Sequence, residues 1–513
     1  MPSRTPWLSM LDILVTAWLG RVMLSAVLIP LITFIVTSVR FHLQSLRREA
    51  DQEPPTLPYA VPWIGSALNL IWDTHRFLTY VKKKNGGRPV KICLANEKPA
   101  YILSRAQDVQ SLFRASKELT FEEFSVRVLE KVKKFPREDG AKMEADTSGS
   151  SVVPLHNVPE STRIWRAVHA NYDSNLTGSG PVSALTNRLL EDKMFRASTR
   201  TLVGDAIFDL SPSFTADFWG ARERVFGAVK AYIAQAWHHL DPRRVDGLDW
   251  DFDDHFGSRL VRTREAMYAN YGLSLDGRAA SEMGLIWSIN SNAIPMVSWM
   301  LVEILSDAHL LSRVQQEILS CVTEEGESIA LARLDVSRVL SLPLLNACYA
   351  ECLRMRASVQ AIRELRTEIR LGGYTLKPGN LVMAPSCLAH YDEATWGADG
   401  HPASVFCADR FLRPAKGRYK FYNPATAGQY FPYGGGAAIC PGRFYAKAEM
   451  LAAVALFLCT LEVQPVGFVD ARGHPSSQGP SMGTETRGTM RLDKDLKILY
   501  RRRERVMESI FSI

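Results

Sequence analysis

The sequence predicts a mostly α-helical protein with small β-sheets, preceded by an N-terminal transmembrane helix. Residues 22–39 are apolar without one charge, and together with residues 13–19 they exceed the roughly 20 residues that span a bilayer. Farther along the chain, three stretches have the character of helices: residues 284–300, 344–356 and 443–461. Two short strand-like runs within residues 371–384 surround a Lys-Pro-Gly turn, which predicts a β-hairpin.

The charges that flank the apolar run predict its orientation. Three arginines follow it within residues 40–50, whereas only two precede it, so the excess favours a cytosolic location for the domain that follows. A cleaved signal peptide is the competing interpretation, but the apolar region is too long for one and no small-residue cleavage site follows it. Prolines crowd the next segment and predict a stiff linker. The predicted domains are therefore an anchor at residues 1–40, a basic and proline-rich hinge at 41–65 and a catalytic domain at 66–513.

Composition agrees with a folded protein tethered to a membrane. The chain has 513 residues, of which 46% are hydrophobic and 22% charged, and its net charge is +7. This basic balance is too small and too dispersed to indicate nucleic acid as a partner. The eight cysteines show no paired spacing, so no disulfide or zinc framework is predicted, and a reducing cytosolic environment suits them.

One cysteine, Cys440, stands in a glycine-rich segment directly before a predicted helix. Glycines at 434–436 and at Gly442 let the backbone turn tightly and approach a flat group closely, while Ile439 and Pro441 confine the cysteine. The free N–H groups at the start of the helix stabilise a thiolate. Such a thiolate suits an axial ligand of haem iron, where it donates the electron density that favours O–O cleavage. The simpler interpretation is a buried cysteine that only fills space.

This segment resembles the haem-binding signature of the cytochrome P450 family. Tyr433, Gly436, Cys440 and Gly442 fit that signature. The segment departs from it in two places, because Tyr433 replaces the usual Phe and Ala438 stands where the family commonly has an Arg or His facing a haem propionate. The resemblance implies the cytochrome P450 fold and haem b, with Cys440 as the axial ligand of the iron.

A second motif resembles the family's Glu-x-x-Arg helix. Glu351 and Arg354 lie three residues apart in a helical stretch, which places them on one face. Alone, this spacing is more often a solvated surface pair. The later segment at residues 401–411 also resembles the family, and its Arg410 would complete a Glu-Arg-Arg cluster behind the haem loop.

The resemblance implies further contacts to the cofactor. Arg363 stands where the family places a propionate-binding arginine, and it would offset the missing partner at Ala438. Trp165 and His169 resemble the Trp-x-x-x-Arg of the family's C helix, with a histidine in place of the arginine. A half-buried tryptophan and a surface histidine are the alternative interpretation.

The long apolar helix expected above the haem departs from typical monooxygenases, because no acid or threonine occurs between Glu282 and Glu303. Pro295 cannot donate to the carbonyl of Ser291 and is expected to kink this helix. The pair Asn292 and Pro295 resembles the branch that contains sterol 7-alpha- and 12-alpha-hydroxylases and prostacyclin synthase. This resemblance makes Asn292 a candidate for orienting substrate or oxygen. Alternatively, Asn292 caps the break made by the proline.

The resemblance implies a haem-thiolate monooxygenase that inserts one oxygen atom from O2 into a sterol, terpenoid or polyketide-like substrate, as in fungal specialised metabolism. The expected electron donor is NADPH-cytochrome P450 reductase, with cytochrome b5 as an additional candidate, and the expected location is the endoplasmic reticulum membrane, with a single pass. Basic residues after Cys440 suit a donor of this kind. Two alternatives stay open: a redox-neutral isomerase or dehydratase acting on a peroxide, and a non-catalytic haem carrier or sensor.

Overall fold

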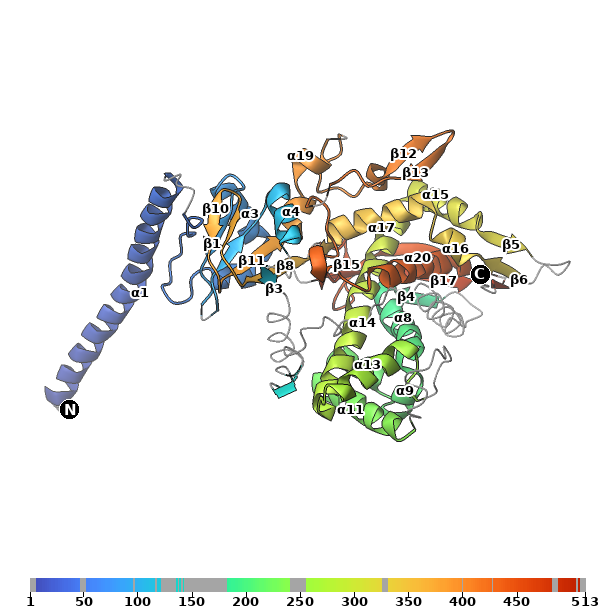
Figure 1. Cartoon of the computed structure of the whole chain (residues 1–513), viewed down its shortest axis with the longest axis horizontal. Coiled ribbons are helices and arrows are strands. Elements are labelled where there is room, and N and C mark those ends of the chain that lie inside the picture. The colour runs from blue at the N-terminus through green and yellow to red at the C-terminus, as the bar shows by residue number, and fades with distance from the viewer. Residues whose placement is uncertain are drawn as a thin grey trace, which may run out of the picture. The chain divides into compact units, whose positions relative to one another are not determined.

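The structure, a computed structural model, describes most of the chain (Figure 1). The described residues are 6–46, 52–95, 97–115, 118–120, 135–136, 138–139, 142, 182–239, 255–324, 331–398, 400–426, 428–481, 488–503 and 506–507. They are mainly helical, with small sheets, which confirms the predicted fold class. The chain forms two compact units: residues 1–120 with 361–389, and residues 121–360 with 390–513.

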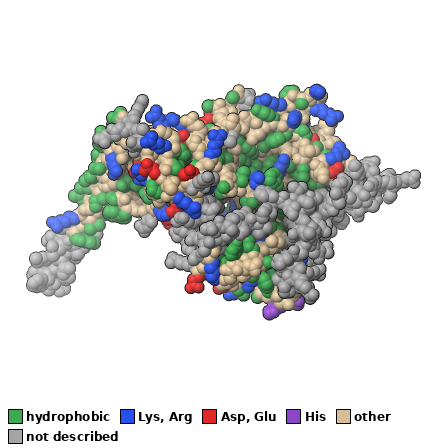
Figure 2. All heavy atoms as spheres, in the orientation of Figure 1, with side chains coloured by type: hydrophobic (Ala, Val, Ile, Leu, Met, Phe, Trp, Pro, Cys, Tyr) green, Lys and Arg blue, Asp and Glu red, His purple; other side chains and the backbone are tan. Residues whose placement is uncertain are grey.

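The first unit begins with the long helix α1 (Pro6–Leu46), and apolar side chains cover much of its described part in Figure 2. The part of this helix from Arg21 to Leu46 is long and apolar enough to cross a membrane and is not buried against the protein. Exposed apolar side chains are stable in lipid rather than in water. The apolar helix is therefore compatible with membrane anchoring. It ends six residues beyond the predicted anchor boundary at residue 40.

The last turns of α1 are held by the segment that follows. The Thr37 hydroxyl donates to the carbonyl of Tyr59 at 3.0 Å and accepts from its N–H. Gln44 accepts from the N–H of Thr56 at 3.0 Å, and Phe41 is buried in the apolar core of the unit. The prolines after α1 therefore lead into a docked segment, which lies parallel to β1 through a bridge between Thr56 and Lys91.

The rest of this unit is a five-stranded sheet with short helices. Its strand order is β1 (Val90–Ile92), β2 (Ala100–Ile102), β11 (Leu381–Pro385), β8 (Gln360–Leu365) and β3 (Leu119–Thr120). The pair β11–β2 is parallel, whereas β1–β2 and β3–β8 are antiparallel. The helices are α2 (Ala67–Trp72), α3 (Thr74–Lys84) and α4 (Ala106–Arg114). The hairpin predicted around the Lys-Pro-Gly turn is wrong in its pairing. β10 (Tyr374–Leu376) pairs with β9 (Ile369–Leu371) across the turn at Gly372 and Gly373, whereas the strand after Lys-Pro-Gly is β11, which lies beside β2 and β8 in the five-stranded sheet.

The second unit is organised around the long helix α14 (Leu275–Ser306), which most of the other long helices contact. These partners are α8 (Thr186–Val203), α11 (Arg222–His239), α13 (Arg259–Asn270), α15 (Ala308–Leu319), α17 (Pro343–Arg356) and α20 (Arg443–Thr460). Ser274 caps the start of α14 by accepting from the N–H of Gly277, a stabilising N-cap. Because α14 is apolar on most faces, it forms the centre of the main hydrophobic core.

Short elements complete the second unit. The shorter helices are α9 (Ala206–Leu210), α10 (Phe214–Phe218), α16 (Val336–Val339), α18 (Ser386–His390, which starts in the first unit) and α19 (Glu393–Trp396). One sheet has the order β15 (Pro475–Ser476), β14 (Leu461–Asp470), β17 (Lys494–Arg502) and β4 (Val182–Leu185). Smaller sheets join β16 (Gly488–Thr489) to β7 (Ala357–Ser358), β12 (Leu412–Ala415) to β13 (Arg418–Phe421), and β5 (Val322–Glu324) to β6 (Leu331–Leu334) and β18 (Val506–Met507).

Candidate active site

Cys440 lies in the loop between a short 3-10 helix, η2 (Gly436–Ala438), and α20. The loop closes through the N–H of Cys440, which donates to the carbonyl of Tyr433 at 3.0 Å. Gly434 and Gly436 have φ angles of 74° and 67°, in the left-handed region that glycine adopts without strain. The predicted role of the glycines in shaping this loop therefore agrees with the observed backbone.

The environment of the sulfur combines burial with local positive charge. Burial raises the pKa of the Cys440 thiol, while the N–H of Gly442 and the guanidinium of Arg443 act to lower that pKa. A β-carbon at Gly442 would lie 3.9 Å from the Cys440 sulfur, so the glycine leaves the space beside the sulfur open. The start of α20 thus presents a backbone donor to the sulfur, as expected from the sequence.

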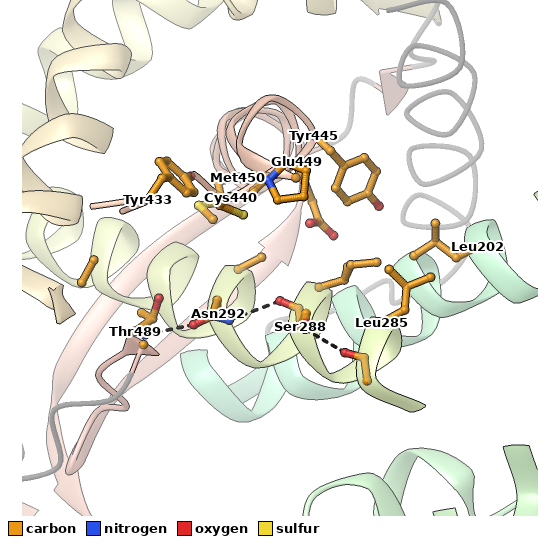
Figure 3. A pocket seen from close by; sticks show the side chains of 18 of the residues that line it. Leu202, Leu285, Ser288, Asn292, Tyr433, Cys440, Tyr445, Glu449, Met450 and Thr489 are labelled. Carbon is orange, nitrogen blue, oxygen red and sulfur yellow. Dashed lines mark hydrogen bonds between the residues drawn. The ribbon is translucent and has the colours of Figure 1, made fainter. Parts of the chain in front are cut away.

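Cys440 lies on the wall of a cavity of about 580 Å³ in the second unit. Figure 3 shows Cys440, Tyr445 and Glu449 on one side of this cavity, and Asn292 and Ser288 of α14 on the other. Most of the remaining wall is apolar. A large apolar cavity with a few polar groups is the usual form of a cofactor and substrate site.

Behind the cysteine loop, Glu351 is held by the two predicted arginines. Arg354 donates to both carboxylate oxygens of Glu351 at 2.7 Å, and Arg410 donates to one of them at 3.2 Å. Both Glu351 and Arg354 are fully buried. The N–H of Cys407 adds a donor at 3.0 Å, so the carboxylate is fully hydrogen-bonded, which a buried charge requires.

Comparison with known proteins agrees with this arrangement. The family model for cytochrome P450 matches residues 291–486, the region that contains Asn292, Cys440 and all three members of the Glu-Arg-Arg cluster. The chain is a cytochrome P450. It is an enzyme of the P450 monooxygenase class, and haem bound through a cysteine thiolate is the cofactor of this family.

Relatives come from fungi and from a mammal. The chain is 28% identical over 506 residues to cytochrome P450 monooxygenase calL of Penicillium decumbens, covering 88% of this chain and 93% of the relative. It is 27% identical to cytochrome P450 monooxygenase efuG of Hormonema carpetanum, covering 85% and 90%. It is 26% identical over 223 residues to cholesterol 7-alpha-monooxygenase of Cricetulus griseus, covering 41% and 43%.

The residues around the cavity fit a haem. Among the described residues, no three His, Cys, Asp or Glu side chains lie close enough together to hold a metal ion, so iron held only by side chains does not fit the cavity. An iron carried within a macrocycle needs one protein ligand, and Cys440 lies on an apolar wall as the side chain suited to that place. The open space beside Gly442 leaves room for the approach of a flat group.

Asn292 faces the cavity, but its amide is already engaged (Figure 3). Its Nδ2 donates to the carbonyl of Ser288 at 3.2 Å, and its Oδ1 accepts from the N–H of Thr489 at 3.0 Å. Asn292 therefore ties β16 to α14, a contact that the sequence did not predict. Pro295 is buried inside α14, which continues as one helix to Ser306, and Pro295 is not on the described cavity wall.

The other predicted cofactor contacts lie in different places. Tyr433 lines the cavity, and its hydroxyl bonds that of Tyr349 in α17. Arg363 is buried on β8 in the first unit, where it donates to the carbonyl of Ile362 at 2.7 Å. Trp165 and His169 lie outside the described residues. The roles of these residues therefore stay predictions.

His390 is a structural residue of the site that sequence reasoning missed. The fully buried imidazole accepts from the N–H of Phe431 at 3.0 Å through Nε2, and its Nδ1 lies 3.1 Å from the carbonyl of Arg354. These partners place the proton on Nδ1. Burial and the charge of Arg354 lower the pKa of His390 to about 3, so a neutral imidazole connects α17 to the cysteine loop.

Glu449 is a second residue that was missed. It lies on α20, is 1% exposed and lines the same cavity as Cys440. Ser198 of α8 donates to its Oε1, whereas Oε2 makes no hydrogen bond within the described part of the chain. Burial raises the pKa of Glu449 to about 8. The sequence held one signal for this residue: Glu449 is the single acid in the otherwise apolar run of residues 448–459. Acids are rarely buried in such runs.

Proposed function

We propose that this cytochrome P450 inserts one oxygen atom from O2 into a lipophilic substrate held between α14 and the cysteine loop. The observation that carries this proposal is the position of Cys440 on the wall of a mostly apolar cavity, opposite Asn292. When bound, haem supplies the oxygen chemistry, and an axial cysteinate favours O–O cleavage.

Some of the site residues are proposed to hold the cofactor, and others support the loop that presents Cys440. Cys440 is the proposed iron ligand, and Tyr433, Gly436 and Gly442 shape the loop that presents it. Three further residues are proposed to contact the haem: Arg363, Trp165 and His169. The cluster of Glu351, Arg354 and Arg410 supports the loop from behind, because a fully satisfied buried charge network rigidifies its surroundings.

On the opposite wall, Asn292 is proposed to position the reacting end of the substrate. Its hydrogen bonds to Ser288 and Thr489 fix the amide in one orientation. The amide nitrogen keeps a second hydrogen, which can donate to a polar group in the cavity. Pro295 supports this geometry from within the helix. The wall of the pocket therefore has a fixed polar point close to the place where oxygen chemistry would occur.

The proposed substrate is a sterol, terpenoid or polyketide-like molecule that partitions into a membrane. Leu285, Ile289 and Ala293 form an apolar strip along α14 inside the cavity, which favours a molecule of low polarity. The similarity to a cholesterol 7-alpha-monooxygenase supports a polycyclic lipid. The fungal relatives support a role in specialised-metabolite biosynthesis.

Membrane attachment and electron supply complete the proposal. Residues 1–40 would anchor the enzyme in the endoplasmic reticulum membrane by a single pass, with residues 41–65 as the connection to a cytosolic catalytic domain at 66–513. Arg443 and Lys447 lie at the start of α20, just beyond the ligand cysteine. These cations would favour docking of an acidic donor, NADPH-cytochrome P450 reductase, with cytochrome b5 as an additional candidate.

A reconstituted turnover assay tests this function. The purified enzyme is mixed with NADPH, a reductase and a library of sterols and terpenoids, and 18O2 is supplied. The expected result is a product that carries one 18O atom and forms only with reductase and NADPH. Rearrangement of a lipid peroxide without either of them, and no labelled product, would instead select the redox-neutral isomerase or dehydratase.

A further inference from the structure

The cavity that contains Cys440 follows α14 for three turns. Four residues on one face of this helix line it, namely Ser281, Leu285, Ser288 and Asn292. Their spacing of three to four residues matches the helical repeat, so they form one continuous strip. Eleven residues of helix rise about 16 Å. A ligand that follows this strip is therefore elongated, with one end near Asn292 and the other near Ser281.

The end near Ser281 carries a positive charge. Arg264 of α13 is the one basic side chain among the described residues of the cavity wall. Its Nε donates to Glu282 at 2.9 Å and its Nη2 to the carbonyl of Ser281 at 3.4 Å. Within the described part of the chain, its other amino group, Nη1, makes no hydrogen bond. The side chain of Arg264 is 19% exposed, and it lines the cavity.

Two arginine–glutamate pairs lie at this end of the cavity. Arg264 pairs with Glu282, and next to them Arg278 pairs with Glu265 at 3.4 Å. Burial raises the pKa of Glu282, and burial with the nearby charge of Glu282 raises that of Glu265 to about 7. Burial therefore disfavours the ionised form of both carboxyl groups, while the guanidinium of Arg264 stays charged.

We propose that Arg264 receives a carboxylate at one end of an elongated lipophilic substrate, whose opposite end is presented at Asn292 and Cys440. This inference rests on the proposed function, because it assigns the orientation of the substrate in that same cavity. A guanidinium with a free amino group on an apolar wall is a strong receptor for a carboxylate. Glu449 also lines the cavity, but burial keeps it largely protonated at neutral pH, so it repels such a ligand little.

A binding assay on the full-length, haem-loaded enzyme tests the assignment without turnover. The probes are 5β-cholanic acid, a rigid polycyclic carboxylic acid, and its neutral methyl ester. Calorimetric titration at pH 7.5 in a fixed detergent gives a Kd for each. The expected result is that the acid binds at least about tenfold more tightly than the ester, as a charge-assisted hydrogen bond would produce.

A matched pair of double variants locates the effect. Arg264→Met with Glu282→Gln removes the ion pair that lines the cavity, without leaving one charge buried alone. The control, Arg278→Met with Glu265→Gln, removes the neighbouring ion pair, which is not on the described cavity wall. The first variant is expected to lose the preference for the acid while binding the ester as before. The control is expected to keep the preference.

Several outcomes would overturn the inference. These are equal binding of acid and ester by the unaltered enzyme, no binding of either, or an unchanged preference in the Arg264 variant. If that variant fails to load haem, Arg264→Lys replaces it, because lysine can keep the pair with Glu282 but has no second amino group. An unchanged Kd for the acid in Arg264→Lys would also overturn the inference. Reductase-dependent turnover of other lipids would in each case leave the proposed function standing.

Discussion

Replacing Arg354 by lysine is expected to destabilise the catalytic domain strongly. Arg354 makes four hydrogen bonds: two to Glu351 at 2.7 Å, one to the carbonyl of His390 at 2.7 Å and one to that of Ala403 at 2.8 Å. Lysine keeps the charge but has three donors on a single nitrogen and cannot reproduce the planar fork. With at least two charge-assisted bonds lost in a fully buried site, the expected cost is about 3 to 5 kcal/mol.

The matched control is Arg313→Lys. Arg313 makes a similar two-point contact, with Asp409, at 2.8 and 3.2 Å, but the two side chains are 29% and 56% exposed. Exposed pairs contribute about 0 to 1 kcal/mol. Urea denaturation followed by the haem absorbance is expected to show a much lower midpoint for Arg354→Lys and nearly the original midpoint for Arg313→Lys. Equal midpoints would refute the claim that burial of the cluster determines its contribution.

Three further predictions concern the cavity and its supports. The pKa of His390 is lowered from 6.5 to about 3, so the stability that its neutral form provides is present above pH 6.5 and is lost as the pH falls toward 3. His390→Gln should flatten this acid dependence of the urea midpoint, and an unchanged slope would contradict the assignment. The pKa of Glu449 is raised from 4.5 to about 8, so stability is highest below pH 4.5 and falls by a few kcal/mol as the pH rises through 8. Glu449→Gln should remove this fall in the urea midpoint. The same fall in the variant and in the unaltered protein would contradict the raised pKa of Glu449. Asn292→Ala should reduce turnover by roughly tenfold or more, because it releases Thr489, while haem loading stays normal. Ser288→Ala is the control, because this change keeps the Asn292 amide and the backbone carbonyl that it binds.

The features that the sequence predicted correctly share one property, which is that their signal is local. The apolar runs that form α1 and α14 and the glycines around Cys440 all act within a few residues. The Lys-Pro-Gly turn is also local and lies between β10 and β11, but the partners of these two strands, β9 and β2, were not predicted. The pair Glu351 and Arg354 is also local, one helical turn apart. Arg410 is more distant, and the resemblance to the family supplied its connection to Glu351.

The features that the sequence did not predict depend on pairings across the fold. His390 receives its two partners from α17 and from the cysteine loop, and Asn292 reaches Thr489, 197 residues away. Neither pairing has a periodic pattern or a turn signal that could indicate it. Arg264 has no motif around it in the sequence, and only the tertiary structure shows that α13 places it on the cavity wall.

The most direct test of the central claim is the ferrous-CO difference spectrum of the full-length protein and of Cys440→Ala. The account predicts a strongly red-shifted Soret band for the unaltered protein and loss of this band in the variant, because the thiolate is its origin. The control Cys407→Ala, a cysteine outside the cavity, should keep the band. A variant at Cys440 that retained the red-shifted band would contradict the assignment of the haem ligand, and with it the proposed function.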